Sequence, residues 1–340
     1  MPCIVRCIRC GNVRKNEELR CPVCGNLYEI YPDFKFQDDY EKNFPYIKKW
    51  VSLGEVETPI VNYGEVKFKI DYYQPTFSYK DRGSKVLISH IRDITPSQNI
   101  STISEDSSGN AGASIAAYGA AAGLKVKVYV PKTVSGQKFK QILVYGAEAV
   151  KIDGNREDVQ IAAENSGYYY ASHVLRPEFR DGIRSLAYEI FMQTEKMPDH
   201  IFIPVSAGTL LIGLYSGFEH LFRSGEIEKI PNIVAVQAEA VSPVCAKLNG
   251  EQFDENSNAT SIADALVSKK PILLEKMLSI LRENGKCIRV SDNEIIEARK
   301  ELALKGIYAE YSSSTVFAAY KKKKLENSLL VLTGAGLKND

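Results

Sequence analysis

One lysine stands where an extended segment should turn into a helix. Lys80 follows Pro75, Thr76 and Ser78 and precedes Asp81-Arg82-Gly83. Proline disfavours helix at the residue before it, and Thr and Ser are preferred caps, so the sequence predicts a helix that begins beside Lys80. The positive end of a helix dipole favours the neutral amine, which is the form that attacks an aldehyde to make a Schiff base. Taken alone, the same spacing also suits a solvated surface lysine.

A second loop has residues suited to holding a carboxylate. Ser107-Ser108-Gly109-Asn110 follows the apolar residues 100–104 and precedes the alanine-rich stretch 113–122. A turn of this kind at the start of a helix presents hydroxyl groups and free backbone amides, which are the donors that a carboxylate needs. Serine and asparagine are also common helix caps, so a purely structural cap is the alternative interpretation.

A third loop has the small residues that let backbone amides approach a phosphate. Val205-Ser206-Ala207-Gly208-Thr209 follows an apolar strand around Ile201 and precedes a helix from Leu210. The dipole of that helix would hold the anion without a lysine or arginine. Since the segment contains a single glycine, an ordinary turn between strand and helix is the alternative.

Near the amino terminus, two pairs of thiols share one spacing, in which each pair is followed by a glycine. These cysteines are Cys7, Cys10, Cys21 and Cys24. Four thiolates close a tetrahedral shell around zinc and leave no open position for water, so the predicted site is structural. Cys3 is an alternative to Cys7, although the doubled spacing favours Cys7. We expect Cys245 and Cys287 to be ordinary buried thiols.

Strands and helices alternate through the region that must position these loops. The pattern predicts strands at 66–72, 100–104, 125–130, 149–152, 168–171 and 329–332, with helices at 113–122, 136–144 and 158–165. Such alternation with short connections is typical of a parallel sheet covered by helices on both faces, and ligands then bind at the carboxyl ends of the strands. The predicted fold class is therefore α/β.

The length and charge of the chain limit its partners. At 340 residues it is long enough to form two lobes around one cleft. A formal net charge of +1 gives no excess for binding nucleic acid or anionic lipid, so a small metabolite is the expected partner. No apolar stretch approaches the length of a membrane helix, and we expect a cytoplasmic protein.

In this order, the motifs resemble those of threonine synthases, which are pyridoxal-phosphate (PLP) enzymes of fold type II. The resemblance runs from the cysteine pairs through Pro75–Gly83, Ser107–Gly112 and the loop at 205–209 to Thr333-Gly334-Ala335-Gly336-Leu337-Lys338. It implies that Lys80 holds PLP and moves protons during catalysis. It also implies a zinc ribbon at 1–30, a large PLP-binding domain at 31–84 and 179–340, a smaller mobile domain at 85–178, and a homodimer.

The same resemblance assigns roles to individual residues. The side chain of Asn110 would contact the ring hydroxyl of PLP, the loop Val205–Thr209 its phosphate, and Thr333 its pyridine nitrogen. The substrate carboxylate would be bound by Ser107, Ser108, Gly109 and Asn110. Arg180 is the candidate for the substrate phosphate. The implied reaction converts O-phospho-L-homoserine and water into L-threonine and phosphate.

Some positions depart from the family pattern, and they keep two alternatives open. Phe77 stands where glycine is usual, Gln74 where asparagine is usual, Ala335 where histidine is usual, and Ala111 where a hydroxyl residue often occurs. One alternative is elimination or replacement on another amino acid, such as phosphoserine, serine or threonine. The other is a non-catalytic zinc-ribbon binding protein on the same scaffold. The four histidines form no recognisable motif with a serine or cysteine nucleophile.

Overall fold

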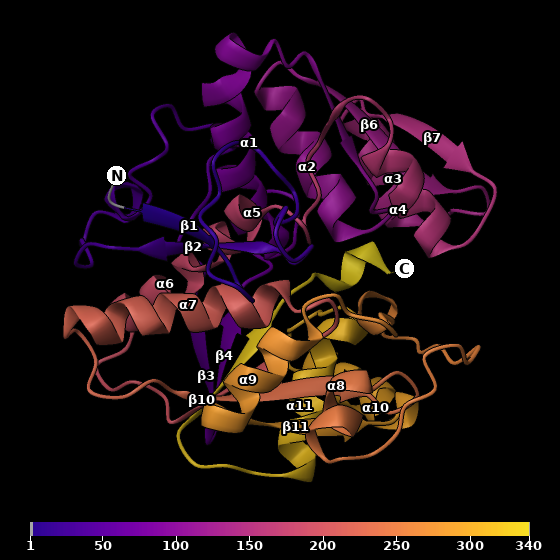
Figure 1. The fold of residues 1–340 in the computed structure, drawn as a ribbon. Helices are drawn as coiled ribbons and strands as arrows, with labels where there is room; N and C mark the ends of the chain where they lie inside the picture. The colour runs from indigo at the N-terminus through magenta and orange to yellow at the C-terminus, as the bar shows by residue number, and fades with distance from the viewer. Residues whose placement is uncertain (1–2, 340) are drawn as a thin grey trace. The chain divides into compact units, whose positions relative to one another are not determined.

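The computed structural model describes residues 3–339, which form two compact units. Unit 1 contains the residues up to Glu55 together with Lys80–Ser185, and unit 2 contains Val56–Tyr79 together with the residues from Leu186 onward. The chain therefore passes from unit 2 to unit 1 between Tyr79 and Lys80. Figure 1 shows the course of the chain from the amino terminus in indigo to the carboxyl terminus in yellow.

Unit 1 is built on a sheet of four parallel strands in the order β7-β6-β5-β8. The strands are β5 (Thr102–Glu105), β6 (Lys125–Pro131), β7 (Glu148–Ile152) and β8 (Tyr169–Tyr170). The helices between them are α2 (Asn110–Ala121), α3 (Gln137–Val144) and α4 (Arg156–Glu164). Each element overlaps one that the apolar pattern predicts, so the expected repeat of strand, loop and helix is confirmed.

Two further helices of unit 1 approach each other closely. They are α1 (Lys80–Gln98) and α5 (Pro177–Ile183). A Cβ atom added at Gly83 would lie 2.6 Å from carbon atoms of the Phe179 ring, so only glycine allows this packing. The contact brings Phe179 to the first turn of α1, where Lys80 lies.

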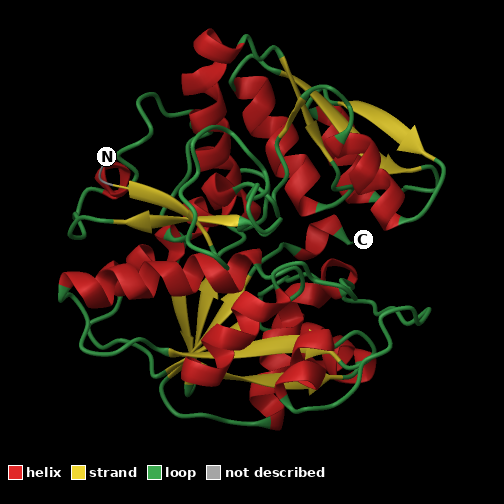
Figure 2. Cartoon of the chain, in the orientation of Figure 1, coloured by secondary structure: helices red, strands yellow, loops and turns green. Residues whose placement is uncertain are grey.

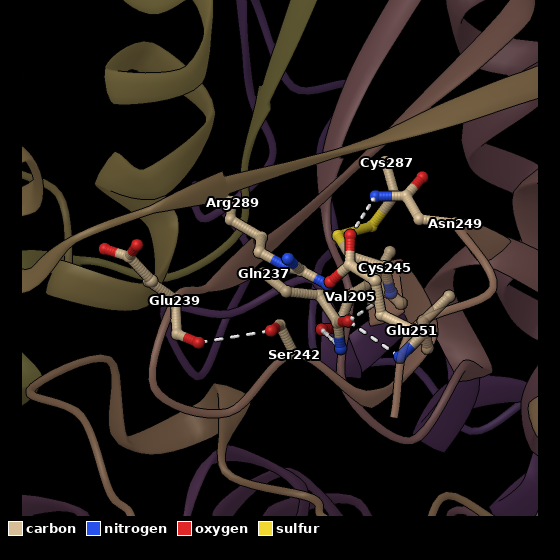
Figure 3. Close-up of a disulfide and its surroundings, with 10 residues drawn as sticks. Val205, Gln237, Glu239, Ser242, Cys245, Asn249, Glu251, Cys287 and Arg289 are labelled. Atoms are coloured by element: carbon tan, nitrogen blue, oxygen red, sulfur yellow. Dashed lines mark hydrogen bonds and ion pairs between the residues drawn. A yellow bond between two sulfur atoms is a disulfide. The ribbon is translucent and has the colours of Figure 1, made fainter. Parts of the chain in front are cut away.

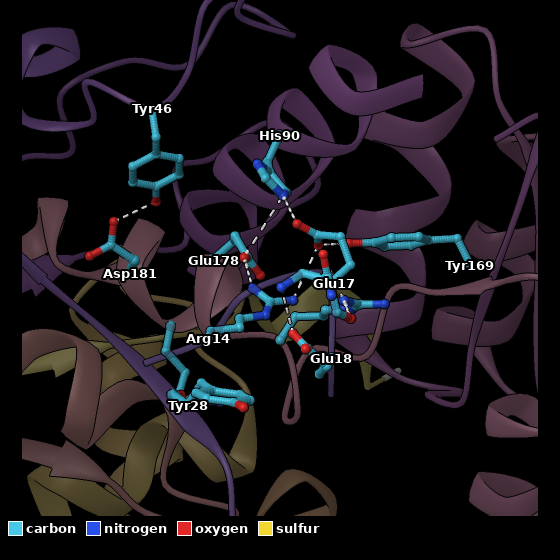
Figure 4. A network of polar contacts seen from close by, with 12 residues as sticks. Arg14, Glu17, Glu18, Tyr28, Tyr46, His90, Tyr169, Glu178 and Asp181 are labelled. Carbon is cyan, nitrogen blue, oxygen red and sulfur yellow. Dashed lines mark hydrogen bonds and ion pairs between the residues drawn. The ribbon is translucent and has the colours of Figure 1, made fainter. Parts of the chain in front are cut away.

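A small antiparallel ribbon at the amino terminus is fastened to α5. It consists of β1 (Cys3–Cys7) and β2 (Tyr28–Pro32). Arg14 forms an ion pair with Glu178 of α5, and Glu17 accepts hydrogen bonds from the Tyr169 hydroxyl at 2.7 Å and from His90 at 3.2 Å (Figure 4). Burial disfavours the charge of Glu17, but its bonds with His90 and the nearby Arg14 outweigh that effect and lower its pKa to about 2.

Unit 2 is built on a six-stranded sheet in the order β11-β10-β9-β12-β4-β3, parallel except for the pair β3 and β4. The strands are β3 (Ile60–Tyr63), β4 (Val66–Ile70), β9 (His200–Pro204), β10 (Asn232–Ala238), β11 (Gly285–Val290) and β12 (Ser328–Leu332). The helices are α6 (Ser185–Gln193), α7 (Thr209–Ser224), α8 (Pro243–Leu248), α9 (Leu274–Asn284), α10 (Asp292–Leu304) and α11 (Tyr311–Lys322).

Helices cover the sheet of unit 2 on both faces (Figure 2). Phe202 and Leu330 share a hydrophobic cluster with Phe317 of α11. The alternate strand residues Ile201 and Leu329 are also fully buried. Residues on both faces of a strand are buried only when both faces of its sheet are covered, as expected for parallel strands. The predicted α/β fold class is therefore confirmed.

One expectation about the cysteines is wrong. Cys245 in α8 and Cys287 in β11 form a disulfide with a Cα–Cα distance of 5.1 Å, whereas we expected two thiols (Figure 3). The fold places the start of α8 beside β11, at the edge of the sheet, so residues 42 positions apart come within bonding range.

Two further expectations concern domains and membranes. The predicted functional division at residues 30, 84 and 178 stays a prediction, and the contacts group residues 31–55 with unit 1. Among residues 3–339, no helix combines the length and apolar character needed to cross a membrane.

Candidate active site

Lys80 is the first residue of α1, as the capping pattern predicts. In unit 1 its Nζ lies 5.8 Å from the centre of the Phe179 ring. The residue before it, Tyr79, belongs to unit 2. There the Tyr79 amide donates to the Thr333 carbonyl at 3.0 Å, and the Tyr79 hydroxyl lies 3.5 Å from the Thr209 hydroxyl. Lys80 is therefore bonded covalently to a residue that contacts two other predicted cofactor-binding segments.

In unit 1, side chains near the amino-terminal ends of α1 and α2 contact each other. The Ser114 hydroxyl of α2 is 2.6 Å from the Ser84 hydroxyl of α1 and also contacts the Asp81 carboxylate. This buried contact fixes the start of α2, where Asn110 lies, relative to the start of α1, where Lys80 lies.

The loop Ser107–Asn110 follows β5 at the carboxyl end of the unit 1 sheet, as predicted. Within the loop, the Gly109 amide donates to the Ser107 hydroxyl at 3.3 Å, and Asn110 begins α2. Ser108 and Gly109 precede the helix, so the amides at its amino-terminal end point toward the loop. This is the arrangement that a bound carboxylate requires.

In unit 2, the loop Val205–Thr209 joins β9 to the amino terminus of α7. Gly208 has φ +99°, and a Cβ atom there would lie 2.7 Å from the sulfur of Met277. The Ser206 hydroxyl accepts a hydrogen bond from the Ser268 amide at 3.3 Å. The loop therefore has the tight, glycine-dependent turn that brings backbone amides close to an anion.

The predicted residues of unit 2 come together at one edge of its sheet. Strands β9, β12 and β4 are adjacent and parallel, so their carboxyl ends share that edge. The loop beginning at Val205 follows β9, Thr333 follows β12, and the segment ending at Tyr79 follows β4. Ligands of open α/β sheets bind at this edge.

Arg180, the candidate for binding a substrate phosphate, lies in α5. Its guanidinium is buried in unit 1 and donates hydrogen bonds to the backbone carbonyls of Tyr28 and Val174. The bond to Tyr28 fastens β2 of the ribbon to α5. Its predicted role in binding a substrate phosphate remains a prediction, and its observed partners are structural.

A buried acidic cluster beside the serine loop was not singled out from the sequence. Glu105, the last residue of β5, pairs with His173 at 2.6 Å between Oε1 and Nδ1. The neighbouring Asp106 pairs with Arg156 at 2.7 Å. Glu105 and His173 each follow or end a predicted strand of one parallel sheet, and this is the signal that could have placed them together.

The four predicted zinc ligands meet in the ribbon. Their sulfur atoms lie within 4.8 Å of one another, as expected for ligands of one metal: Cys7, Cys10, Cys21 and Cys24. Each pair is closed by a turn in which a glycine amide donates to a cysteine carbonyl, Gly11 to Cys7 at 3.0 Å and Gly25 to Cys21 at 2.8 Å. Cys3 instead pairs with Pro32 in the ribbon strands. The donor set suits zinc.

Comparisons with known proteins agree with this arrangement. A family model described as pyridoxal-phosphate dependent enzyme matches residues 51–334. Threonine synthase of Methanocaldococcus jannaschii is 29% identical over 98% of this chain and 92% of its own length. Threonine synthase of Synechocystis is 30% identical over 80% of this chain and 71% of its own length.

Solved structures share the fold. A PLP-dependent aspartate racemase has a TM-score of 0.72 and 23% identity, covering 87% of this chain and 94% of its own. The processed form of threonine deaminase isoform 2 from Solanum lycopersicum has a TM-score of 0.71 and 20% identity, covering 89% of this chain and 86% of its own. Enzymes with different names therefore share this architecture, so the fold alone does not select a reaction.

Proposed function

Because this chain belongs to the family of pyridoxal-phosphate-dependent enzymes, we propose that it is a lyase of the threonine synthase type. Its substrates would be O-phospho-L-homoserine and water, and its products L-threonine and phosphate. The observation that carries the proposal is the position of Lys80, which begins a helix directly after Tyr79, whose atoms contact Thr209 and Thr333.

The residues present fit PLP. The turn at Gly208 has no room for a Cβ atom and opens the 16-residue helix α7, which suits a phosphate group. Thr333, at the end of the neighbouring strand, offers a hydroxyl rather than a carboxylate to the pyridine nitrogen. A hydroxyl would leave that nitrogen unprotonated, because only a carboxylate would hold a proton there.

Bound PLP would supply an electron sink that stabilises negative charge at a substrate carbon. The chain would supply the rest of the chemistry. Lys80 Nζ would hold the cofactor and then move protons at the α and β carbons of the substrate. Ser107, Ser108 and the backbone of Gly109 would orient the substrate carboxylate, and Asn110 would fix the ring of the cofactor. Zinc at the four cysteines would have a structural role.

The test is an absorbance spectrum combined with an assay. With PLP, the wild-type protein should show the visible band of cofactor bound to a lysine, and Lys80→Ala should lose it because no other amine replaces Nζ. The wild type should release phosphate and L-threonine from O-phospho-L-homoserine. Lys85→Ala, which changes a lysine of α1 that pairs with Glu55, is the matched control. A visible band retained in Lys80→Ala would contradict the assignment of this lysine.

A second candidate has structural support. The Arg180 guanidinium is buried in unit 1 and donates to backbone carbonyls. This arrangement does not favour the binding of a substrate phosphate by Arg180. The alternative substrates are O-phospho-L-serine, L-serine and L-threonine. A protein with this second function would form the visible band, would make no L-threonine from O-phospho-L-homoserine, and would convert one of these alternative substrates.

We also propose a homodimer. Sedimentation of the cofactor-loaded protein would give the mass of two chains, and a single-chain mass would refute this assembly.

A further inference from the structure

The disulfide of unit 2 and the predicted phosphate loop are connected through one buried side chain. Strands β10 and β11 are parallel, with Ala235 opposite Cys287 and Gln237 opposite Arg289. Opposite residues, and residues two positions apart in a strand, point to the same face of a sheet. The side chains of Cys287 and Gln237 therefore share one face. Helix α8 contacts this face, because its third residue, Cys245, is bonded to Cys287.

Gln237 holds α8 and the loop at the same time. Its Oε1 accepts hydrogen bonds from the amides of Val244 and Cys245 in α8, and its Nε2 donates to the carbonyl of Val205 at 3.3 Å (Figure 3). Val205 is the first residue after β9 and begins the predicted phosphate loop. Because the oxygen and nitrogen belong to one planar amide, the position of the first turn of α8 determines where Nε2 points.

The disulfide contributes strongly to the position of α8. The helix spans six residues, and a helix this short is unstable unless other contacts hold it. A further connection to β11 is the ion pair between Glu251, which follows the helix, and Arg289 at 2.6 Å. Both side chains are partly open to water, where such pairs contribute little. Breaking the disulfide therefore loosens the start of α8 and the two amides that hold Gln237.

The two cysteines differ in their access to a reductant. Cys245 is 1% exposed, whereas Cys287 is partly exposed and lies in β11, the strand at one edge of the sheet. A thiolate of a dithiol would therefore attack the Cys287 sulfur and release the Cys245 sulfur as a thiolate, which takes up a proton. The second thiol of the reductant then displaces Cys287 from the mixed disulfide. Two electrons and two protons pass to the protein, and the dithiol becomes a disulfide.

We propose that the bond between Cys245 and Cys287 is a redox-sensitive control of PLP binding. In the oxidised protein, α8 is held in place and Gln237 fixes the backbone at Val205. In the reduced protein, the loop loses this restraint and binds the phosphate group of PLP more weakly. The inference rests on the proposed PLP function of the loop Val205–Thr209, and it is independent of the amino-acid substrate.

The test compares the PLP affinity of the oxidised and the reduced full-length protein. The wild type is reduced with a phosphine, separated from the reductant without oxygen, and titrated with PLP by its visible band, while thiol titration confirms each redox state. Reduction should weaken PLP binding about threefold to tenfold, the range expected for loss of one hydrogen bond. Cys245→Ala/Cys287→Ala keeps the ribbon cysteines and is the matched control. It should bind PLP like the reduced wild type, with or without phosphine treatment.

A second comparison separates the route through Gln237 from a general loss of stability. Gln237→Glu keeps the acceptor for α8 but has no donor for the Val205 carbonyl, so reduction should lower its unfolding midpoint and leave its PLP affinity unchanged. Gln237→Met, which lacks both polar groups, repeats the comparison if Gln237→Glu does not fold. Gln252→Glu, at an exposed glutamine of unit 2, should respond to reduction as the wild type does.

Two results would overturn the inference. One is equal PLP affinity of the oxidised and reduced wild type. The other is a reduced Gln237→Glu protein that loses as much PLP affinity as the reduced wild type loses. A wild type that shows no visible band with PLP in either redox state would instead refute the PLP function itself.

Discussion

At the scale of single residues, Gln237 joins a helix start to the predicted phosphate loop. Its Oε1 accepts hydrogen bonds from the amides of Val244 at 2.9 Å and Cys245 at 3.0 Å, and its Nε2 donates to the Val205 carbonyl at 3.3 Å (Figure 3). Gln237 is 1% exposed, so water does not replace these bonds readily. This one amide therefore sets the backbone direction at the first residue of the loop.

Replacing Gln237 should weaken both folding and PLP binding. Gln237→Leu would leave two amides and one carbonyl buried without partners, which costs about 1–3 kcal/mol for each such group. Gln237→Glu would keep the acceptor but place a carboxylate against the Val205 carbonyl, so it should impair PLP binding more than it impairs folding. Urea unfolding and titration with PLP measure the two effects. Gln252→Leu, at an exposed glutamine of unit 2, is the control. Equal PLP affinity in all four proteins would contradict this role.

Glu17 should make the stability of the protein depend on pH in acid. Its pKa is about 2 in the folded state against an ordinary value of 4.5. A lowered pKa contributes stability that is complete above the unfolded value and is lost as the pH falls from about 4.5 through about 2. Glu17→Gln should therefore destabilise the protein at pH 6 and much less at pH 2.5.

Denaturant midpoints at the two pH values test this prediction. Glu297→Gln, at an exposed carboxylate of α10, should show the same small effect at both. The measured quantity is the difference in denaturant midpoint between the wild type and Glu17→Gln. If this difference is the same at both pH values, the Glu17 carboxyl group is not ionised in the network of Figure 4.

The role of a single residue could be predicted only where it depends on residues that are close to it in the sequence. The helix start at Lys80, the turn at Gly208 and the cysteine pairs were foreseen because capping, turn and ligand spacing act within a few residues. His173 could not be predicted, because its partner Glu105 is distant along the chain. A buried pair of this kind depends on strand register, which a single sequence does not specify.

At the scale of elements, the ribbon stabilises α5 and through it the surroundings of Lys80. Arg14 pairs with Glu178, and Arg180 donates to the Tyr28 carbonyl, so the ribbon and α5 share buried polar contacts. Phe179, which borders Lys80, lies between these two residues of α5. The ribbon in which the four cysteines meet therefore supports the surroundings of Lys80 through α5.

Removing the metal ligands should lower stability more than PLP binding. Cys21→Ser/Cys24→Ser should abolish binding of one zinc per chain and lower the melting temperature, because half of the thiolate shell is gone. The visible PLP band should remain at temperatures where the variant is folded. Cys3→Ser should keep the metal, since Cys3 lies outside the cluster. Metal analysis with absorbance spectra checks both, and a catalytic rate proportional to zinc content would contradict a structural role.

The disulfide between α8 and β11 should contribute measurable stability. Closing a loop between residues 42 positions apart restricts the unfolded chain, and disulfides typically add roughly 2–4 kcal/mol. Cys245→Ala/Cys287→Ala should lower the free energy of unfolding by this order. A thiol reductant should destabilise the wild type and have no such effect on the variant. If the unfolding midpoint of the wild type is the same with and without reductant, the two cysteines are thiols.

Individual strands and helices can be predicted from this sequence, but the strands that lie side by side in a sheet cannot. The pattern of apolar residues predicts β4, β6 and β12, because the burial of a strand is encoded in the residues of that strand. The bond between Cys245 and Cys287 was missed because it depends on β11 pairing beside β10, and general rules for a chain of this kind favour free thiols.

At the scale of the whole molecule, two compact units are each assembled from separated stretches of chain. The α/β class and the parallel sheets were predictable because strands and helices alternate regularly. The grouping of residues 31–55 with unit 1 was not, since Phe44 and Ile47 show their burial against Val86 only in the folded state. The chain passes from one unit to the other three times. The order of the elements determines where it does so, and a change in amino-acid composition does not.

The position of β12 affects how the protein folds while it is being synthesised. This strand lies between β9 and β4 but is the last of the sheet to leave the ribosome. Until it emerges, β4 and β9 in the nascent chain expose backbone edges that can pair with other polypeptides. We therefore expect the growing chain to need a chaperone through most of translation, and mutations that delay release to cause aggregation even when the mature enzyme is stable.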